Sequence, residues 1–131
     1  MHHMNVQTKK RVELIDITAA VRKEVENSRV KDGVCYIYTP HTTTAITINE
    51  NADPSVVHDI NTWLNKLVPF AQGYTHMEGN SDAHIKSSLI GCSETVLIKE
   101  GKILLGTWQG IFFCEFDGPR DRTVYMKVTA G

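Results

Sequence analysis

The chain has no apolar run that approaches the ~20 residues of a membrane-spanning helix, and its N-terminus has no apolar signal-peptide core. It also has no excess of charge, since 14 Lys and Arg residues stand against 15 Asp and Glu residues. The net charge of −1 gives no global positive field that would gather nucleic acid or an anionic membrane. We therefore expect neither nucleic acid nor a membrane as a partner.

Cysteine is scarce, and none of it forms a CxxC pair. Cys35 and Cys114 lie within apolar runs, where a thiol usually acts as a small buried hydrophobe. This pattern predicts a reduced, cytoplasmic protein. Low-complexity sequence is absent too, and 131 residues, 41% of them hydrophobic, suffice for one folded domain over residues 1–131. Residues 1–4 could be an addition to the natural chain or disordered, so His2 and His3 receive no functional weight.

Hydrophobic periodicity predicts an α+β domain with a mainly antiparallel sheet or sandwich, two longer helices and one short helix. The clearest helix start is Asp53-Pro54, because Asp caps a helix well and Pro fits its first position. In the short helix, we expect Ile85, Leu89 and Ile90 to point inward. The expected order is strand, helix, two strands, two helices and four strands, over residues 5–15, 16–30, 34–39, 44–48, 54–68, 82–90, 93–99, 102–105, 108–116 and 123–128.

One polar loop carries metal-ligand residue types at a regular spacing. Polar side chains follow one another here in steps of two at His76, Glu78, Asn80, Asp82 and His84. Imidazole and carboxylate groups are the usual ligands of zinc and similar divalent ions. The spacing matches neither a zinc-finger pattern nor the HExxH pattern of metalloproteases. An Asx-rich loop whose side chains bond their own backbone, with Asp82 as a helix N-cap, therefore stays open beside the metal site.

The start of the short helix is also a candidate anion site. Its free N–H groups and the positive end of its dipole favour negative charge, and Lys86 with Ser87 and Ser88 could complete a phosphate cradle. His41, which follows a proline and precedes three threonines, could face the same pocket, or it could be a turn histidine bonded to those threonines.

Three further groups have both a functional and a structural interpretation. Glu50 could act as a general base or metal ligand, or it could simply favour the helix start that follows it. Arg120 and Arg122 could clamp a phosphate bidentately, or they could belong to a solvated turn. Gln109 offers a donor and an acceptor within Gly106-Thr107-Trp108-Gln109-Gly110, where the glycines allow close backbone approach.

Taken together, these motifs resemble the YjbQ family over residues 5 to 128. Where family sequences often read Asn-Ala-Asp-Ala-His, this chain has Asn80-Ser81-Asp82-Ala83-His84. The resemblance is carried by Pro40-His41-Thr42-Thr43, Asn49-Glu50-Asn51-Ala52-Asp53-Pro54, Asp82-Ala83-His84-Ile85-Lys86, the stretch from Ser93 to Gly106-Thr107-Trp108-Gln109-Gly110-Ile111, and Glu115-Phe116-Asp117-Gly118-Pro119-Arg120.

The resemblance implies an α+β fold, a homotrimer, and a secondary thiamine-phosphate synthase activity. That activity joins a pyrimidine pyrophosphate to a thiazole phosphate and releases pyrophosphate, and it can be a side reaction of the physiological role. On this basis we expect a phosphorylated small-molecule substrate and a divalent metal ion, zinc or magnesium. The expected residues are His76, Asp82 and His84 for the metal, Lys86, Ser87, Arg120 and Arg122 for phosphate, and His41, Glu50 and Gln109 for catalysis.

Two other functions would use the same residues. The first is a non-catalytic trimeric module that binds phosphate or metal, which the absence of a GxSxG motif and of a reactive-looking cysteine favours. The second is a metal-dependent hydrolase of phosphate esters. Affinity for a phosphate ester without any product would favour the module, whereas turnover in a phosphatase screen would favour the hydrolase.

Overall fold

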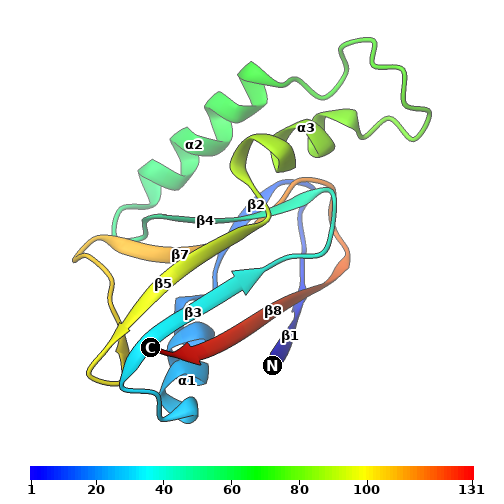
Figure 1. Cartoon of the computed structure of the whole chain (residues 1–131). Helices are drawn as coiled ribbons and strands as arrows, with labels where there is room; N and C mark the ends of the chain where they lie inside the picture. Colours follow the sequence, from blue (N-terminus) through cyan, green and yellow to red (C-terminus); the bar gives the residue numbers. More distant parts are fainter.

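The structure, a computed structural model that describes residues 1–131, contains eight strands and three helices (Figure 1). Its strands form two antiparallel sheets, one in the order β1-β8-β3-β5-β6 and the other in the order β2-β7-β4. This is a single α+β domain, so the predicted fold class is confirmed. The elements are β1 (His2–Gln7), β2 (Glu13–Asp16), α1 (Thr18–Ser28), β3 (Asp32–Tyr38), β4 (Thr44–Glu50), α2 (Pro54–Leu67), α3 (Ser81–Ile90), β5 (Ser93–Lys99), β6 (Lys102–Ile103), β7 (Gln109–Glu115) and β8 (Asp121–Ala130).

The main core lies between the two sheets and is completed by α1. Alternating side chains of the strands, such as Cys35 and Ile37 of β3, point into it and are fully buried. Val21 and Val25 of α1 join them because they lie four residues apart on one helical face. Each such side chain stabilises the fold by roughly 1.5–3 kcal/mol through its burial. The outer loops are thereby held on a rigid frame.

The first predicted strand, residues 5–15, was wrong in extent, because the chain forms two strands in different sheets. β1 pairs with β8, whereas β2 pairs with β7. Between them the chain turns, with the backbone N–H groups of Lys9 and Lys10 donating to the Glu13 carboxylate at 2.6 and 2.9 Å. β1 begins at His2, which pairs with Met126, so the expectation of disorder in residues 1–4 is also corrected.

α3 packs against β4 on the outer face of the three-stranded sheet, but with an unexpected side inward. The prediction that Ile85 and Leu89 point inward is wrong, since both are exposed and Leu89 retains 55% of its accessible surface. The buried residues are Asp82, Ala83, Lys86 and Ser87. Their polar groups tolerate burial because each has a partner within the protein, described below.

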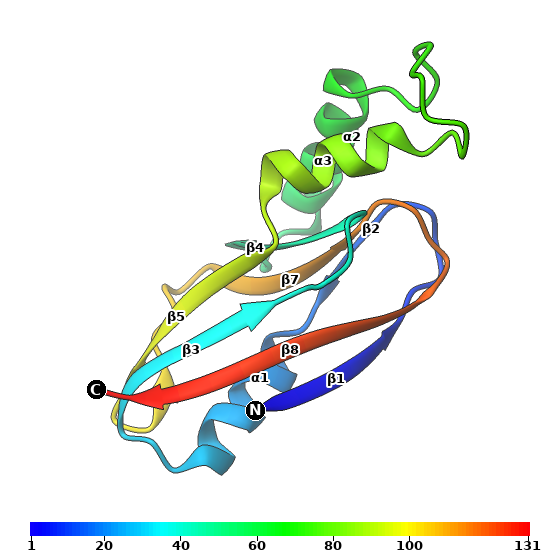
Figure 2. The ribbon, with the colours of Figure 1, turned by 45° about the vertical axis from the view of Figure 1, so that its right-hand side comes forward.

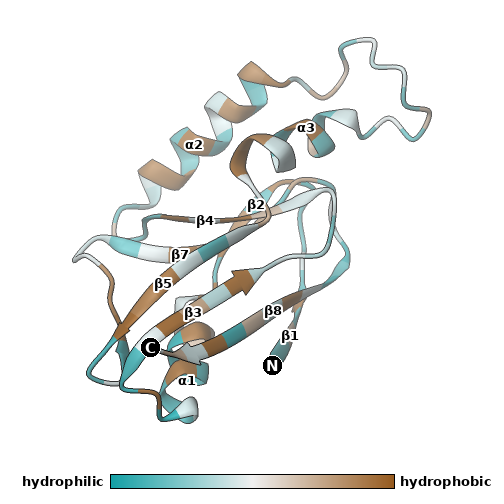
Figure 3. Ribbon diagram, in the orientation of Figure 1, coloured by the Kyte–Doolittle hydropathy of each residue, from teal (hydrophilic) through white to brown (hydrophobic).

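α2 begins as predicted, with the Asp53 carboxylate accepting a hydrogen bond from the Ser55 N–H at 2.9 Å. It then runs along the outside of the molecule, on the same side of the sheets as α3 (Figure 2). None of its residues is buried, and Trp63 and Leu67 are 66% and 70% exposed. Apolar residues therefore remain uncovered along this helix (Figure 3). None of the three helices combines the length and the apolar character needed to cross a membrane.

Candidate functional site

A polar cavity of about 490 Å³ opens where three loops and the start of one helix meet. It lies between the β3–β4 loop, the segment before α3, the first turns of α3, and the β7–β8 loop. Every lining residue except proline is polar or charged. The lining residues are Pro40, His41, Thr42, Thr43, His76, Glu78, Asn80, His84, Asp117, Arg120 and Arg122.

Arg122 is the most tightly held positive charge of this cavity. Its Nε and Nη2 donate to the two carboxylate oxygens of the fully buried Glu115 at 2.8 and 2.6 Å. Nη2 also donates to the Thr43 hydroxyl at 2.8 Å, while Glu115 accepts further hydrogen bonds from Thr8 and the Asp117 N–H. This network fixes the guanidinium plane and leaves Nη1 without a protein partner. Arg122 can therefore donate to a ligand without reorganising.

Arg120 is held in a similar way at the cavity mouth. Its Nε donates to the Asp117 carbonyl at 2.8 Å, and its Nη2 donates to the Asp117 carboxylate at 3.0 Å. The Asn80 amide nitrogen donates to the same carboxylate at 2.8 Å. Arg120 thus also keeps Nη1 free, and the buried Oδ1 of Asn80 has no partner either. The two arginines thus offer unpaired donors and the amide offers an unpaired acceptor. This lining is suited to a ligand that has an anionic group and a hydrogen-bond donor beside it.

His41 contacts the cavity as a neutral imidazole. Its Nε2 accepts a hydrogen bond from the Thr123 N–H at 2.9 Å, which places the proton of the neutral ring on Nδ1. Burial lowers the pKa of His41, and the positive charge of Arg122 lowers it further against the opposing Glu115 carboxylate. A neutral ring with a free Nδ1–H can donate to a ligand oxygen in the cavity.

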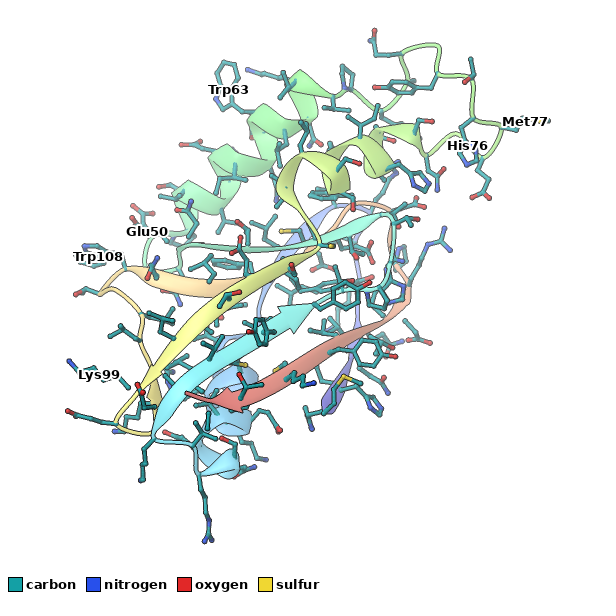
Figure 4. All side chains as sticks on the ribbon, viewed as in Figure 1. Glu50, Trp63, His76, Met77, Lys99 and Trp108 are labelled. Atoms are coloured by element: carbon teal, nitrogen blue, oxygen red, sulfur yellow. The ribbon has the colours of Figure 1, made fainter.

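His76 and His84 also line the cavity, with ring centroids 5.6 Å apart in an edge-to-face arrangement. His76 belongs to the loop before α3 (Figure 4). The third predicted metal ligand, Asp82, does not join them. Successive helical residues turn by ~100°, so Asp82 and His84 point in nearly opposite directions within α3.

Asp82 is instead bound by Arg11, whose two terminal nitrogens donate to its carboxylate oxygens at 3.1 and 3.0 Å. No three His, Cys, Asp or Glu side chains of the chain come together in a way that could hold a metal ion. The predicted ligand set of His76, Asp82 and His84 is therefore not formed, because the steps-of-two pattern requires an extended chain and Asp82 lies in a helix.

Lys86 and Ser87, predicted to bind phosphate, lie outside the polar cavity. Lys86 is almost fully buried, donates to Asn65 of α2, and its Nζ lies 5.7 Å from the centroid of the Phe116 ring. Burial lowers the pKa of Lys86, and the nearby Asp82 carboxylate partly opposes this. Ser87 donates to the Thr44 carbonyl at 2.6 Å. Both residues thus link α3 to its neighbours.

Glu50 and Gln109, predicted to be catalytic, lie at the opposite end of the molecule. They pair with each other across β4 and β7, six residues of β4 away from Thr44, or ~20 Å along an extended strand. Glu50 lies far from His76 in Figure 4 as well. Gln109 lines a separate polar cavity with Asp16 and Arg22 and accepts a hydrogen bond from the Gly106 N–H at 2.8 Å. The structure therefore does not bring these two residues to His41 within one chain.

Sequence reasoning missed Glu115, Asn80 as an arginine-positioning residue, and the backbone of Thr123. Glu115 had a recognisable signal, since a lone carboxylate follows four apolar residues of a strand that the fold buries. The hydrogen bond from Thr123 to His41 spans 82 residues and has no local signal.

Comparison with known proteins places this architecture in a family. The family model described as UPF0047 protein YjbQ-like matches residues 2–131. The UPF0047 protein MJ1081 of Methanocaldococcus jannaschii is 63% identical over 94% of this chain and 89% of its own, and YugU of Bacillus subtilis is 48% identical over 95% and 96%. The chain belongs to the YjbQ/UPF0047 family.

Solved structures agree with this assignment. A YjbQ/UPF0047 family protein from Clostridium acetobutylicum superposes with a TM-score of 0.97 at 51% identity, covering 98% of this chain and 100% of that one. A protein of unknown function from Sulfolobus solfataricus superposes with a TM-score of 0.96 at 33% identity, covering 99% and 96%. Both cover the sandwich and the outer helices together.

Proposed function

We propose that the polar cavity binds the phosphate or pyrophosphate of a phosphorylated small molecule, and that the protein is a group-transfer enzyme. The supporting observation is the pair of arginines, Arg120 and Arg122, each held by a carboxylate and each with Nη1 unpaired. Guanidinium groups fixed in advance are suited to phosphate oxygens because little rotational freedom is lost when the ligand binds.

The reaction that fits this lining is the thiamine-phosphate-synthase-like transfer that the family resemblance implies. The bond from a pyrimidine-bearing carbon to oxygen breaks, a thiazole phosphate supplies the new bond to that carbon, and pyrophosphate leaves with the electron pair. Negative charge builds on the leaving oxygens, and Arg120 and Arg122 would stabilise it. His41 would donate its Nδ1–H to one of those oxygens. No metal enters this proposal, because Asp82 does not join His76 and His84 and no group of three ligands forms.

We also propose that the chain assembles as a homotrimer, the state that the family resemblance implies. The exposed apolar residues of α2, chiefly Trp63 and Leu67, support the assembly, because they lie four residues apart on one helical face and large exposed apolar groups that gather on a surface often contact another protein. The exposed Leu89 of α3 adds to it.

A comparison of three proteins tests the enzymatic proposal. We expect the wild-type protein to form thiamine phosphate from the pyrimidine pyrophosphate and the thiazole phosphate, and Arg120→Met to lower the rate about 100-fold. Arg120 is the better target than Arg122, because its side chain is half-exposed and its loss leaves no fully buried carboxylate unpaired. Arg22→Met, in the separate polar cavity, is the matched control.

The proposal fails if Arg120→Met retains the wild-type rate, or if Arg22→Met loses as much activity. Phosphate binding by the wild-type protein without any product would favour the non-catalytic module.

A further inference from the structure

A separate polar cavity of about 480 Å³ lies at the end of the molecule opposite to the cavity of the two arginines. The ends of β2 and β4, the first turns of α1 and the turn between β6 and β7 form it. Figure 4 labels Trp108 at this end. The sequence motifs 49–54 and 106–111 meet here, and the proposed transfer uses neither of them. The structure therefore contains a second candidate site, here called the Asp16–Arg22 cavity.

Two opposite charges line this cavity without forming an ion pair with each other. The ion pairs of the chain are formed by other residues, and the guanidinium of Arg22 makes no hydrogen bond within the protein. The Asp16 carboxylate accepts hydrogen bonds from the N–H and hydroxyl of Thr18 at 2.9 and 2.5 Å and from the Asn51 amide nitrogen at 3.1 Å. Burial raises the pKa of Asp16, but these hydrogen bonds and the charge of Arg22 outweigh burial and lower the pKa below its ordinary value. The carboxylate is therefore fixed in place and ionised at neutral pH.

Two amide side chains complete the polar wall, and the neighbouring backbone fixes both of them. A Cβ at Gly110 would overlap the Asn51 side chain, so only glycine allows Asn51 to occupy this position. The Asn51 amide nitrogen is bonded to Asp16, which leaves its Oδ1 free as an acceptor. The Oε1 of Gln109 accepts a hydrogen bond from the Gly106 N–H at 2.8 Å, which leaves Nε2 free as a donor. The cavity thus offers an unpaired acceptor and an unpaired amide donor besides its two charges.

The combination of a fixed anion with an unpaired cation selects against ligands of a single charge. Phosphate would be repelled by Asp16, whereas a simple amine would be repelled by Arg22. A small ligand that carries an ammonium group and a carboxylate close together satisfies both residues, and charge-assisted hydrogen bonds then offset its loss of water. The apolar part of the wall, formed by Ala19, Ile103 and Leu105, provides a contact for a short apolar side chain.

We infer that the Asp16–Arg22 cavity binds a free α-amino acid with a short apolar side chain. The ammonium group of the ligand donates to the Asp16 carboxylate and to Oδ1 of Asn51. The carboxylate of the ligand accepts from the guanidinium of Arg22 and from Nε2 of Gln109. This binding is independent of the proposed transfer, because the Asp16–Arg22 cavity shares no lining residue with the polar cavity. Failure of one proposal therefore leaves the other standing.

Calorimetry of the wild-type protein with matched ligands tests whether both charges are recognised. L-Leucine carries both charges, leucinamide lacks the carboxylate, and 4-methylpentanoate lacks the ammonium group. We expect L-leucine to bind at least about tenfold more tightly than either analogue, because the loss of a charge-assisted hydrogen bond weakens binding by about that factor or more. Binding of either analogue as tightly as L-leucine would overturn the inference, and so would the absence of saturable binding for both L-leucine and L-alanine.

Variants of the two charged residues then assign the binding to this cavity. Arg22→Met and Asp16→Asn should each weaken the binding of L-leucine at least about tenfold. Asp16→Asn keeps an acceptor for the Thr18 N–H, so the start of α1 is preserved, and a melting curve like that of the wild type confirms the fold of each variant. Lys127→Met, which removes an exposed positive charge from β8, is the matched control and should bind L-leucine as the wild type does. Wild-type affinity in both Arg22→Met and Asp16→Asn, or an equal loss in Lys127→Met, would overturn the assignment.

Discussion

Replacement of Arg11 by Met should destabilise the protein by about 3 kcal/mol, because it leaves the Asp82 carboxylate buried without its partner. Asp82 is completely inaccessible, while the Arg11 side chain retains 32% of its surface. Removing one member of a buried ion pair costs ~3–5 kcal/mol. The partial hydration of Arg11 and the nearby Lys86 place this pair at the lower end of that range. Arg11 also lies 4.0 Å from the centroid of the Phe70 ring, so its loss frees the loop that carries His76.

Urea unfolding and thermal melts of a double-mutant cycle measure this loss of stability directly. Arg11→Met alone should lower the melting temperature of a domain of this size by roughly 10 °C. The variant with both Arg11→Met and Asp82→Leu removes both charges, so we expect it to be more stable than the sum of the single effects by at least about 2 kcal/mol. Additive single effects would refute the ion pair as the reason for the burial of Asp82.

Because the pKa of His41 is lowered on folding, the unfolded chain binds a proton first as pH falls, so the free energy of unfolding should drop as the pH falls below the ordinary histidine pKa of 6.5. His41→Asn should flatten that drop in urea titrations, and an identical profile would contradict the prediction. Glu115→Ala leaves the buried Arg122 charge unpaired and should cost about 3–5 kcal/mol in thermal melts, whereas a loss below about 1 kcal/mol would argue against the pair. If the proposed trimer assembles through α2, Trp63→Glu, with Leu67→Glu as a second variant, should give a monomer in light scattering, and a wild-type mass for both variants would remove α2 from the proposed interface.

Local sequence patterns predicted most elements because their signals are short-range. The Asp53-Pro54 start of α2 and the span of β5 agree with the structure, since capping and strand alternation depend on neighbouring residues. The inward face of α3 was wrong because apolar spacing alone says nothing of Arg11, 71 residues away, which makes burial of Asp82 tolerable. A hydrophobicity pattern therefore mispredicts the buried face of a helix when the buried polar groups have partners far away in the sequence.

The candidate site could be predicted from the sequence only in part. His41 lies in the β3–β4 loop, while His84 and Arg122 lie at the starts of α3 and β8, so the convergence of element ends brings them to one cavity. Glu50 and Gln109 carry equally suggestive chemistry, but only the direction and register of β4 show that they lie at its far end.

The most direct measurement is a crystal structure of the protein grown with pyrophosphate. We expect the anion in the polar cavity, within hydrogen-bonding distance of Nη1 of Arg120 and Nη1 of Arg122 and of Nδ1 of His41. Pyrophosphate bound instead beside Arg22 and Gln109 in the separate cavity, with Arg120 and Arg122 untouched, would contradict the assignment.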